Sequence, residues 1–142
     1  METHRPLVYL VVDDAKYFQA LIDALERCTP YEYKILPHFD LLFNRLRLGS
    51  TRPRVIILDD GHPFSRTWVG ADIYRKLRAE FGPDTPPVIV TTTNIRQARD
   101  GFGEYTDELR SLGLTDIFIA PNINPRELAA TITQRTSPTS AP

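Results

Sequence analysis

The sequence has little of several features that mark particular classes of protein. It contains one cysteine, Cys28, so no disulfide can form within the chain and nothing indicates an oxidising compartment. It has no long hydrophobic run, because the longest, from Leu7 to Val12, is far too short to span a bilayer and leads into acidic residues. We therefore expect a soluble, cytoplasmic protein with no membrane partner.

Neither sign of charge is in excess. The 17 Lys and Arg residues are balanced by 18 Asp and Glu, and a net charge of -1 gives no general reason to expect a nucleic-acid partner. One group of arginines is interpreted as a solvated basic face rather than a nucleic-acid patch: Arg45, Arg47, Arg52 and Arg54. The sequence also lacks a glycine-rich phosphate loop and an obvious general acid–base pair, which argues against a nucleotide-binding enzyme or a phosphohydrolase.

Segments typical of strands and helices alternate along the chain. Apolar residues at helical spacing predict a helix over residues 15–28, and Thr29-Pro30 ends it. Asp40 is the expected N-cap of a second helix, for which Gly49 supplies a left-handed stop. Asn124 followed by Pro125 predicts the start of the last helix. The remaining helices are expected at 71–81 and 104–112, with a start near Ile95 as the alternative for the second. The strands are expected at 7–12, 31–36, 54–59, 87–92 and 115–120.

This alternation predicts a single α/β domain over residues 1–135. Strands that alternate with helices favour a parallel sheet with right-handed crossovers and a helix layer on each face. We expect a flavodoxin-like three-layer sandwich with five helices and a five-stranded parallel sheet in the order 2-1-3-4-5. Residues 136–142 are rich in Ser, Thr and Pro and are predicted to form a disordered tail.

Two of the strands run directly into carboxylates. Asp13 and Asp14 follow the first strand, and Asp59 ends the third. In the expected strand order these ends meet at the topological switch point, where ligands bind in such sheets. Three crowded carboxylates either raise a pKa or recruit a cation, and their oxygen ligands suit Mg²⁺. An aspartate at a strand end can also simply cap the next helix, but three together favour a site for phosphoryl transfer, with Thr91 or Thr92 contacting the phosphoryl group.

Residues 6–135 resemble the receiver domains of two-component response regulators. The acidic pair after the first strand matches the family's metal-binding acids, and Leu58-Asp59 with Pro63 four residues later matches its acceptor segment. The resemblance implies that Asp59 is the phosphoacceptor and that Asp13, Asp14 and Asp59 bind Mg²⁺. In the family, a residue with a hydroxyl group follows at a fixed spacing after the proline that precedes the fourth strand. If Pro87 is taken as that proline, the residue at this spacing is Thr92. Pro121 matches the proline after the fifth strand.

Two positions depart from the family pattern. Ala120 stands where receivers have a lysine, and Ile117 stands where they have an aromatic residue, although Phe118 is its neighbour. Without that lysine, a charge-assisted contact to the phosphoryl group is missing. We expect a substitute charge, if there is one, from Lys16, His62 or Arg66, while a lone loop histidine such as His62 is more often only solvated.

The resemblance implies a response regulator in two-component phosphorelay signal transduction, here a stand-alone receiver-like phosphoprotein rather than an enzyme. A histidine kinase or a phosphotransfer protein would phosphorylate Asp59 with Mg²⁺ as cofactor, and phosphorylation would change the affinity for a downstream protein partner. The only catalysis expected is self-phosphorylation and autodephosphorylation. The alternative is a pseudo-receiver, an interaction module that works without phosphorylation because of Ala120. Two segments are longer than in typical receivers, one that contains Phe64 and Trp68 and one around residues 99–105. Phe64 and Trp68 would either form a partner-binding patch beside the pocket or fold back over the third helix.

Overall fold

Five parallel strands form one sheet in the order β2-β1-β3-β4-β5, which confirms the predicted flavodoxin-like topology. The computed structural model describes residues 6–12, 15–49, 52–59, 70–92, 105–119 and 123–136. The strands are β1 (Leu7–Val11), β2 (Glu32–Leu36), β3 (Val55–Asp59), β4 (Val88–Thr92) and β5 (Ile117–Ile119). Because β2 and β3 flank β1 on opposite sides, the chain reverses its direction of winding between β1 and β3.

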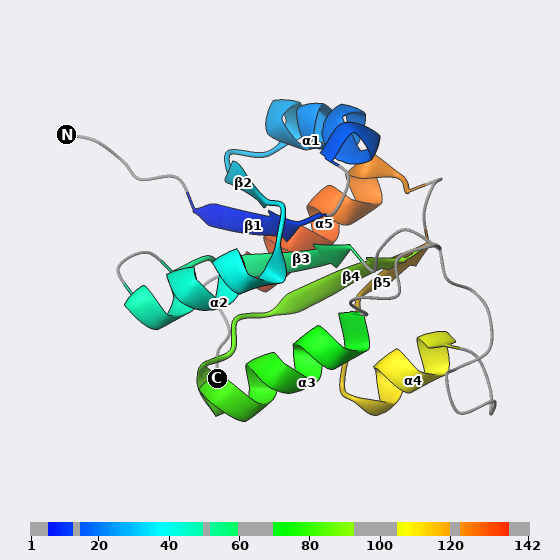
Figure 1. Cartoon of the computed structure of the whole chain (residues 1–142). Coiled ribbons are helices and arrows are strands. Elements are labelled where there is room, and N and C mark those ends of the chain that lie inside the picture. The colour runs from blue at the N-terminus through cyan, green and yellow to red at the C-terminus, as the bar shows by residue number, and fades with distance from the viewer. Residues whose placement is uncertain are drawn as a thin grey trace.

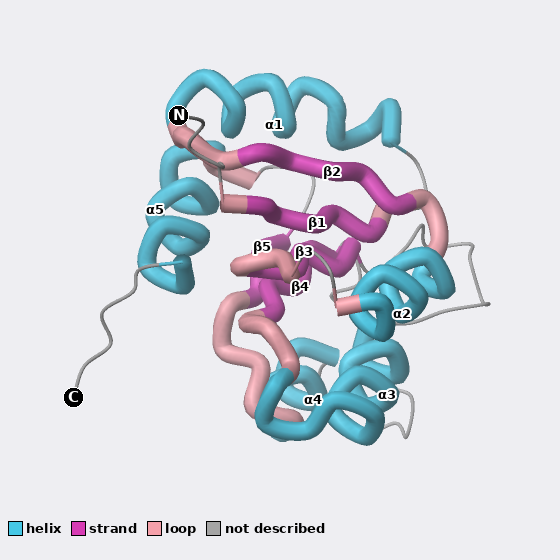
Figure 2. The backbone as a smooth tube through the Cα atoms, turned by 90° about the vertical axis from the view of Figure 1, so that its left-hand side faces the viewer, coloured by secondary structure: helices cyan, strands magenta, loops and turns pink. Residues whose placement is uncertain are grey.

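Helices cover both faces of the sheet and make three layers (Figures 1 and 2). On one face lie α1 (Ala15–Cys28) and α5 (Pro125–Thr136), and on the other lie α2 (Phe39–Leu48), α3 (Gly70–Phe81) and α4 (Tyr105–Ser111). A short 3-10 turn, η1 (Gly82–Asp84), follows α3. Within the described ranges, no helix is both long and apolar enough to cross a membrane.

Alternate residues of the strands fill two separate cores. In β3, Ile56 and Leu58 pack with residues of α2, α3 and α4, whereas Val55 and Ile57 pack with residues of α1 and α5. All four are fully buried, as expected for a strand in the middle of a parallel sheet. The same alternation decides on which face the strand-end polar side chains lie.

The ends of α2 confirm one sequence prediction and correct another. Gly49 caps the C-terminus at φ 67°, and its N–H donates to Arg45 O at 3.3 Å, so the predicted left-handed stop is confirmed. The predicted N-cap, Asp40, is wrong. The N-cap is His38, which is extended and whose Nδ1 accepts from the Asp40 N–H at 3.3 Å, so Asp40 lies in the first turn of the helix.

The last helix begins as predicted and ends one residue later. Asn124 Oδ1 accepts from the N–H groups of Arg126 at 2.9 Å and Glu127 at 3.4 Å, which is an N-cap arrangement. The helix continues through Thr136, whose buried hydroxyl donates to Tyr31 Oη at 3.0 Å. The rest of the predicted tail, residues 137–142, lies outside the described residues.

The strand predicted at 115–120 is shorter in the structure. Gly113 at φ 97° and Leu114, whose N–H donates to Leu109 O at 3.1 Å, form the C-terminal turn of α4. Regular strand geometry then begins only at Ile117. The preceding residue still contributes to the sheet, because Val90 N–H donates to Asp116 O at 3.0 Å. The α4 helix ends at Ser111, one residue before its predicted end at Leu112.

Candidate functional site

The candidate site lies at the carboxyl ends of β1 and β3. These strands are direct neighbours, with Val11 opposite Leu58, so both end at the same edge of the sheet. Asp59 is the last residue of β3 and is described in full. Asp13 and Asp14, which follow β1 in the sequence, lie outside the described residues, so their predicted role as metal ligands remains a prediction.

Asp59 is held by a threonine of the neighbouring strand. Asp59 and Thr91 are partners in the β3–β4 register, and Thr91 Oγ1 donates to Asp59 Oδ1 at 3.1 Å. The Asp59 residue is 8% exposed and Thr91 is fully buried. A hydrogen bond to an ionised carboxylate inside the protein is stronger than the same bond in water, because little solvent competes for either partner. The contact therefore orients the carboxylate at the sheet edge.

Thr92, the hydroxyl residue that the family count selects, comes one position later in β4. Strand alternation places it on the face of Val88 and Val90, which pack with the cluster formed by α2, α3 and α4, whereas Thr91 shares the face of Ile89. Thr92 is also fully buried. The hydroxyl that contacts Asp59 in the structure is thus that of Thr91, and the predicted contact of Thr92 with a phosphoryl group remains a prediction.

Ile117, which stands at the expected aromatic position, and its neighbour Phe118 lie on opposite faces of β5. Phe118 is opposite Thr91 in the register and packs with the α1 and α5 side of the core, so Asp59, Thr91 and Phe118 form a row across three strands. Ile117 packs with the α2, α3 and α4 side. Phe118 therefore does not replace the aromatic residue expected at Ile117, because one step along a strand changes the face.

A divalent metal ion fits the oxygen chemistry at this edge. Asp59 supplies a carboxylate at a strand end, and such oxygen ligands suit Mg²⁺. Among the described residues, no three His, Cys, Asp or Glu side chains converge as a metal site would require, and Asp13 and Asp14 are not among those residues. Other sequence candidates also lie outside them, namely His62, Pro63, Phe64, Arg66, Trp68, Ala120 and Pro121. Lys16 is in α1, at the end of the helix nearest β1.

The chain matches no protein-family model and no curated protein sequence. Its structure is similar to the Francisella response regulator 1452 receiver domain, with a TM-score of 0.69, 18% identity, and coverage of 92% of this chain and 96% of that one. This chain has the fold of a response-regulator receiver domain. The predicted resemblance in fold is confirmed.

Two further receiver structures support the same assignment. The signal receiver domain of a DNA-binding response regulator from Colwellia psychrerythraea 34H has a TM-score of 0.68 and 22% identity, covering 91% of this chain and 96% of that one. The Vibrio cholerae chemotaxis protein CheY4 has a TM-score of 0.68 and 20% identity, covering 92% of this chain and 98% of that one. At this level of identity, the likeness establishes the receiver fold and leaves function to be argued from the residues.

The resemblance to the family points to Thr92, whereas the threonine that contacts Asp59 in the structure is Thr91. Both Thr91 and Thr92 are candidates from the sequence, and the position relative to Pro87 favours Thr92. The signal that separates them is the pairing register of two strands 32 residues apart, which places Thr91 beside Asp59. No local pattern encodes that register, so the distinction needed the tertiary structure.

Proposed function

We propose that this chain is a receiver-like signal-transduction protein that accepts a phosphoryl group on Asp59 and thereby changes its affinity for a protein partner. The single observation that supports this most is the position of Asp59. It is the last residue of β3, lies at the switch-point edge of a receiver fold, and is oriented by Thr91 at 3.1 Å. A carboxylate held in one orientation needs less rearrangement to attack a phosphorus atom.

The proposed reaction is a transfer between two nucleophiles. An oxygen of the Asp59 carboxylate attacks the phosphorus of a phosphohistidine on a kinase or phosphotransfer protein. A P–O bond to Asp59 forms while the P–N bond to the imidazole breaks, and the departing imidazole takes up a proton. Thr91 keeps the carboxylate in place, and Thr92 is the proposed donor to an oxygen of the transferred group. Mg²⁺, when bound by Asp13, Asp14 and Asp59, would offset the negative charge of the phosphoryl group.

The second candidate is a pseudo-receiver, a binding module that works without phosphorylation. Ala120 favours it, because no ammonium group at that position can pair with a phosphoryl group. The different faces of Ile117 and Phe118 favour it too, since Phe118 is not placed to act as the switch residue. A neutral replacement of Lys16, His62 and Arg66 together tests the active version, because an unchanged phosphorylation rate rejects the substitute charge.

One experiment separates the candidates. The protein is incubated with Mg²⁺ and a small phosphodonor such as acetyl phosphate, and intact mass is recorded for the wild type, for Asp59→Asn and for Asp84→Asn. Asp84 is an exposed aspartate in the turn before β4 and serves as the matched control. One phosphoryl addition that is lost only in Asp59→Asn supports the proposal. Mg²⁺ binding without any addition supports the pseudo-receiver, and steady release of phosphate from unrelated esters indicates an enzyme.

A further inference from the structure

The strand β2 is one edge of the sheet. Within the described ranges β2 pairs only with β1, so no strand of those ranges covers its other side (Figure 2). Glu32 N–H donates to Pro6 O at 2.9 Å, so the backbone polar groups of Glu32 point toward β1. Because this direction alternates along a strand, the N–H and C=O groups of Tyr33 and Ile35 point away from β1. Another strand can therefore add to β2 at this open edge.

The side chains of β2 lie on two faces. Tyr33 and Ile35 pack with the core on the α1 and α5 side, where a hydrogen bond of 2.7 Å joins Tyr33 Oη and Thr29 Oγ1. Glu32 and Lys34 are exposed on the opposite face, and among the described residues neither forms an ion pair. The open edge thus carries two opposite charges, two positions apart on one face.

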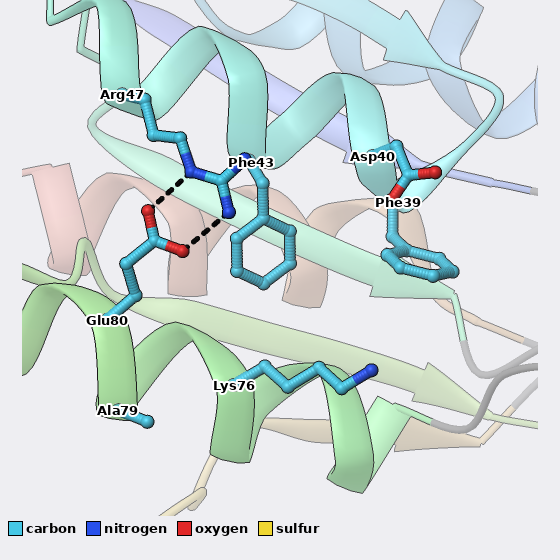
Figure 3. Close-up of a pocket in the computed structure, with 7 residues that line it drawn as sticks. All are labelled: Phe39, Asp40, Phe43, Arg47, Lys76, Ala79 and Glu80. Carbon is cyan, nitrogen blue, oxygen red and sulfur yellow. Dashed lines mark hydrogen bonds and ion pairs between the residues drawn. The ribbon is translucent and has the colours of Figure 1, made fainter.

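The helix beside this face of the edge is α2, which packs against β1 and β2. On one side α2 faces α3, and Phe39 and Arg47 meet Lys76 and Glu80 across a pocket there (Figure 3). Arg47 donates from Nε and from a terminal nitrogen to the two carboxylate oxygens of Glu80 at 2.6 and 2.7 Å. This two-point contact fixes which side of α2 faces α3, so the opposite side of α2 faces the open edge at β2.

The side of α2 that faces the open edge carries two exposed leucines. Leu41 is 42% exposed and Leu48 is 76% exposed, and among the described residues these are the exposed large hydrophobic side chains. They are seven positions apart and lie about half a turn from the stripe of Phe39 and Arg47, so both are on the side away from α3. Arg45 lies between them and is partly buried, so its aliphatic stem adds to the apolar surface. Apolar surface therefore borders the open edge.

From this arrangement we infer that the open edge of β2 pairs with β2 of a second copy of this chain, in an antiparallel dimer centred on Tyr33. Glu32 of each copy would lie opposite Lys34 of the other copy, which gives two ion pairs. Tyr33 of each copy would exchange N–H and C=O hydrogen bonds with Tyr33 of the other. The two α2 helices would lie on one face of the joined sheet, with Leu41 and Leu48 turned toward the joint. A twofold dimer requires one self-complementary surface, and this edge supplies it.

The charges of β2 favour this register and this partner. A pairing centred on Lys34 would place two lysines directly opposite each other, and one centred on Glu32 would place two glutamates there. Like charges directly opposite destabilise an antiparallel pair, whereas opposite charges stabilise it. A lysine on an edge strand usually opposes the addition of another strand. Here the lysine meets a glutamate when the added strand is β2 itself, which favours a second copy over an unrelated strand.

The first test exchanges the two charges. Sedimentation equilibrium of the full, unphosphorylated chain should show a monomer–dimer equilibrium. Lys34→Glu and Glu32→Lys each turn two attractive pairs into two repulsive ones, so each should weaken the dimer by at least about tenfold. The double variant restores both opposite-charge pairs and should return the dissociation constant to within about threefold of the wild type. Lys76→Glu, at an exposed lysine of α3, is the matched control and should leave the dimer unchanged.

The second test reads the register by cross-linking. All proteins carry Cys28→Ser, which removes the native thiol. Copies with Glu32→Cys are mixed with copies with Lys34→Cys and oxidised. In the inferred register these two positions lie opposite each other with Cα atoms about 4.5 Å apart, which a disulfide can bridge. The mixture also keeps one Glu32–Lys34 pair, so it should form disulfide-linked dimers faster than either variant alone.

Several results would overturn the inference. One is a monomer at every concentration, which would leave the edge to a strand of another protein or to solvent. Another is a dimer that neither charge reversal weakens, which would place the interface elsewhere. Failure of the double variant to restore the dimer would reject the pairing of Glu32 with Lys34, and so would equal cross-linking of the mixture and of either variant alone. The measurements involve no phosphorylation, so their failure leaves the proposed role of Asp59 untouched.

Discussion

The hydrogen bond from Thr91 to Asp59 leads to a quantitative prediction about stability. Replacing Thr91 with valine substitutes a methyl group for the hydroxyl and removes the donor to Asp59 Oδ1 at 3.1 Å. Asp59 is 8% exposed and Thr91 is not exposed, so water competes poorly for this hydrogen bond. A hydrogen bond to a charged group contributes about 1.5–3 kcal/mol. We expect Thr91→Val to lower the free energy of unfolding by about 2 kcal/mol at neutral pH.

A double-mutant cycle isolates this contact from other effects of the substitutions. The free energy of unfolding is measured by urea denaturation for the wild type, Thr91→Val, Asp59→Ala and the double variant. In the Asp59→Ala background, Thr91→Val removes no hydrogen bond to a carboxylate. The effects of the two substitutions on the free energy of unfolding should therefore not be additive. The expected coupling energy is about 1–2 kcal/mol. Thr91→Ser keeps the hydroxyl and should retain most of the coupling.

Thr92 provides the matched control for this cycle. It is the next residue of β4 and is equally buried, but it lies on the other face of the strand. Thr92→Val combined with Asp59→Ala should show a coupling of less than about 0.5 kcal/mol, as for sites without a shared contact. A coupling this small for Thr91 would refute the reasoning, and so would equal couplings for the two threonines.

Three further predictions concern groups outside the candidate site. The hydrogen bond to Arg47 lowers the pKa of Glu80. The ion pair therefore stabilises the protein at pH values above the ordinary glutamate pKa of 4.5, and this stabilisation is lost as the pH falls through the lowered pKa. The difference in thermal stability between the wild type and Glu80→Gln should therefore vanish in acid. Burial raises the pKa of Tyr33 to about 12, so a phenol absorbance titration should show a step there that Tyr33→Phe removes. Arg135 binds both oxygens of Asp116 at 2.6 and 3.0 Å, and Arg135→Gln should cost about 1 kcal/mol in urea denaturation.

A specific result would contradict each of these three predictions. A stability difference for Glu80→Gln that persists unchanged in strong acid would contradict the ion pair. A Tyr33→Phe titration identical to that of the wild type would contradict the burial of that phenol. Unaltered denaturation of Arg135→Gln would mean that the pair with Asp116, whose side chain is 17% exposed, contributes nothing measurable.

The sequence alone determined the secondary structure and the fold class. The apolar stripe over residues 15–28 predicts the bounds of α1, because a helix needs one apolar residue each turn on its buried face. Gly49 marks a helix end because a residue without a side chain adopts the left-handed backbone of the C-cap. Asn124 marks a helix start because its side-chain oxygen accepts from a backbone N–H of the first turn. Continuous aliphatic strands alternating with helices leave few topologies, and the acidic ends of the first and third strands favoured the order 2-1-3-4-5 among them.

Local patterns were insufficient where two neighbouring residues compete for one role. His38 rather than Asp40 caps α2, because the cap requires an extended backbone at that residue and the pattern specifies only a suitable side chain. The same limit applies to Ile117 and Phe118, since both are apolar and only the face of the strand distinguishes them.

The tertiary structure decided the contacts between distant segments. It placed Thr91 against Asp59 across 32 positions and Arg47 against Glu80 across 33, and it brought Phe39 and Lys76 to one pocket from two helices. The physical reason is that a residue's own neighbours in the chain determine its backbone preference. The partner that its side chain meets depends on strand register and helix packing, which are properties of the whole core.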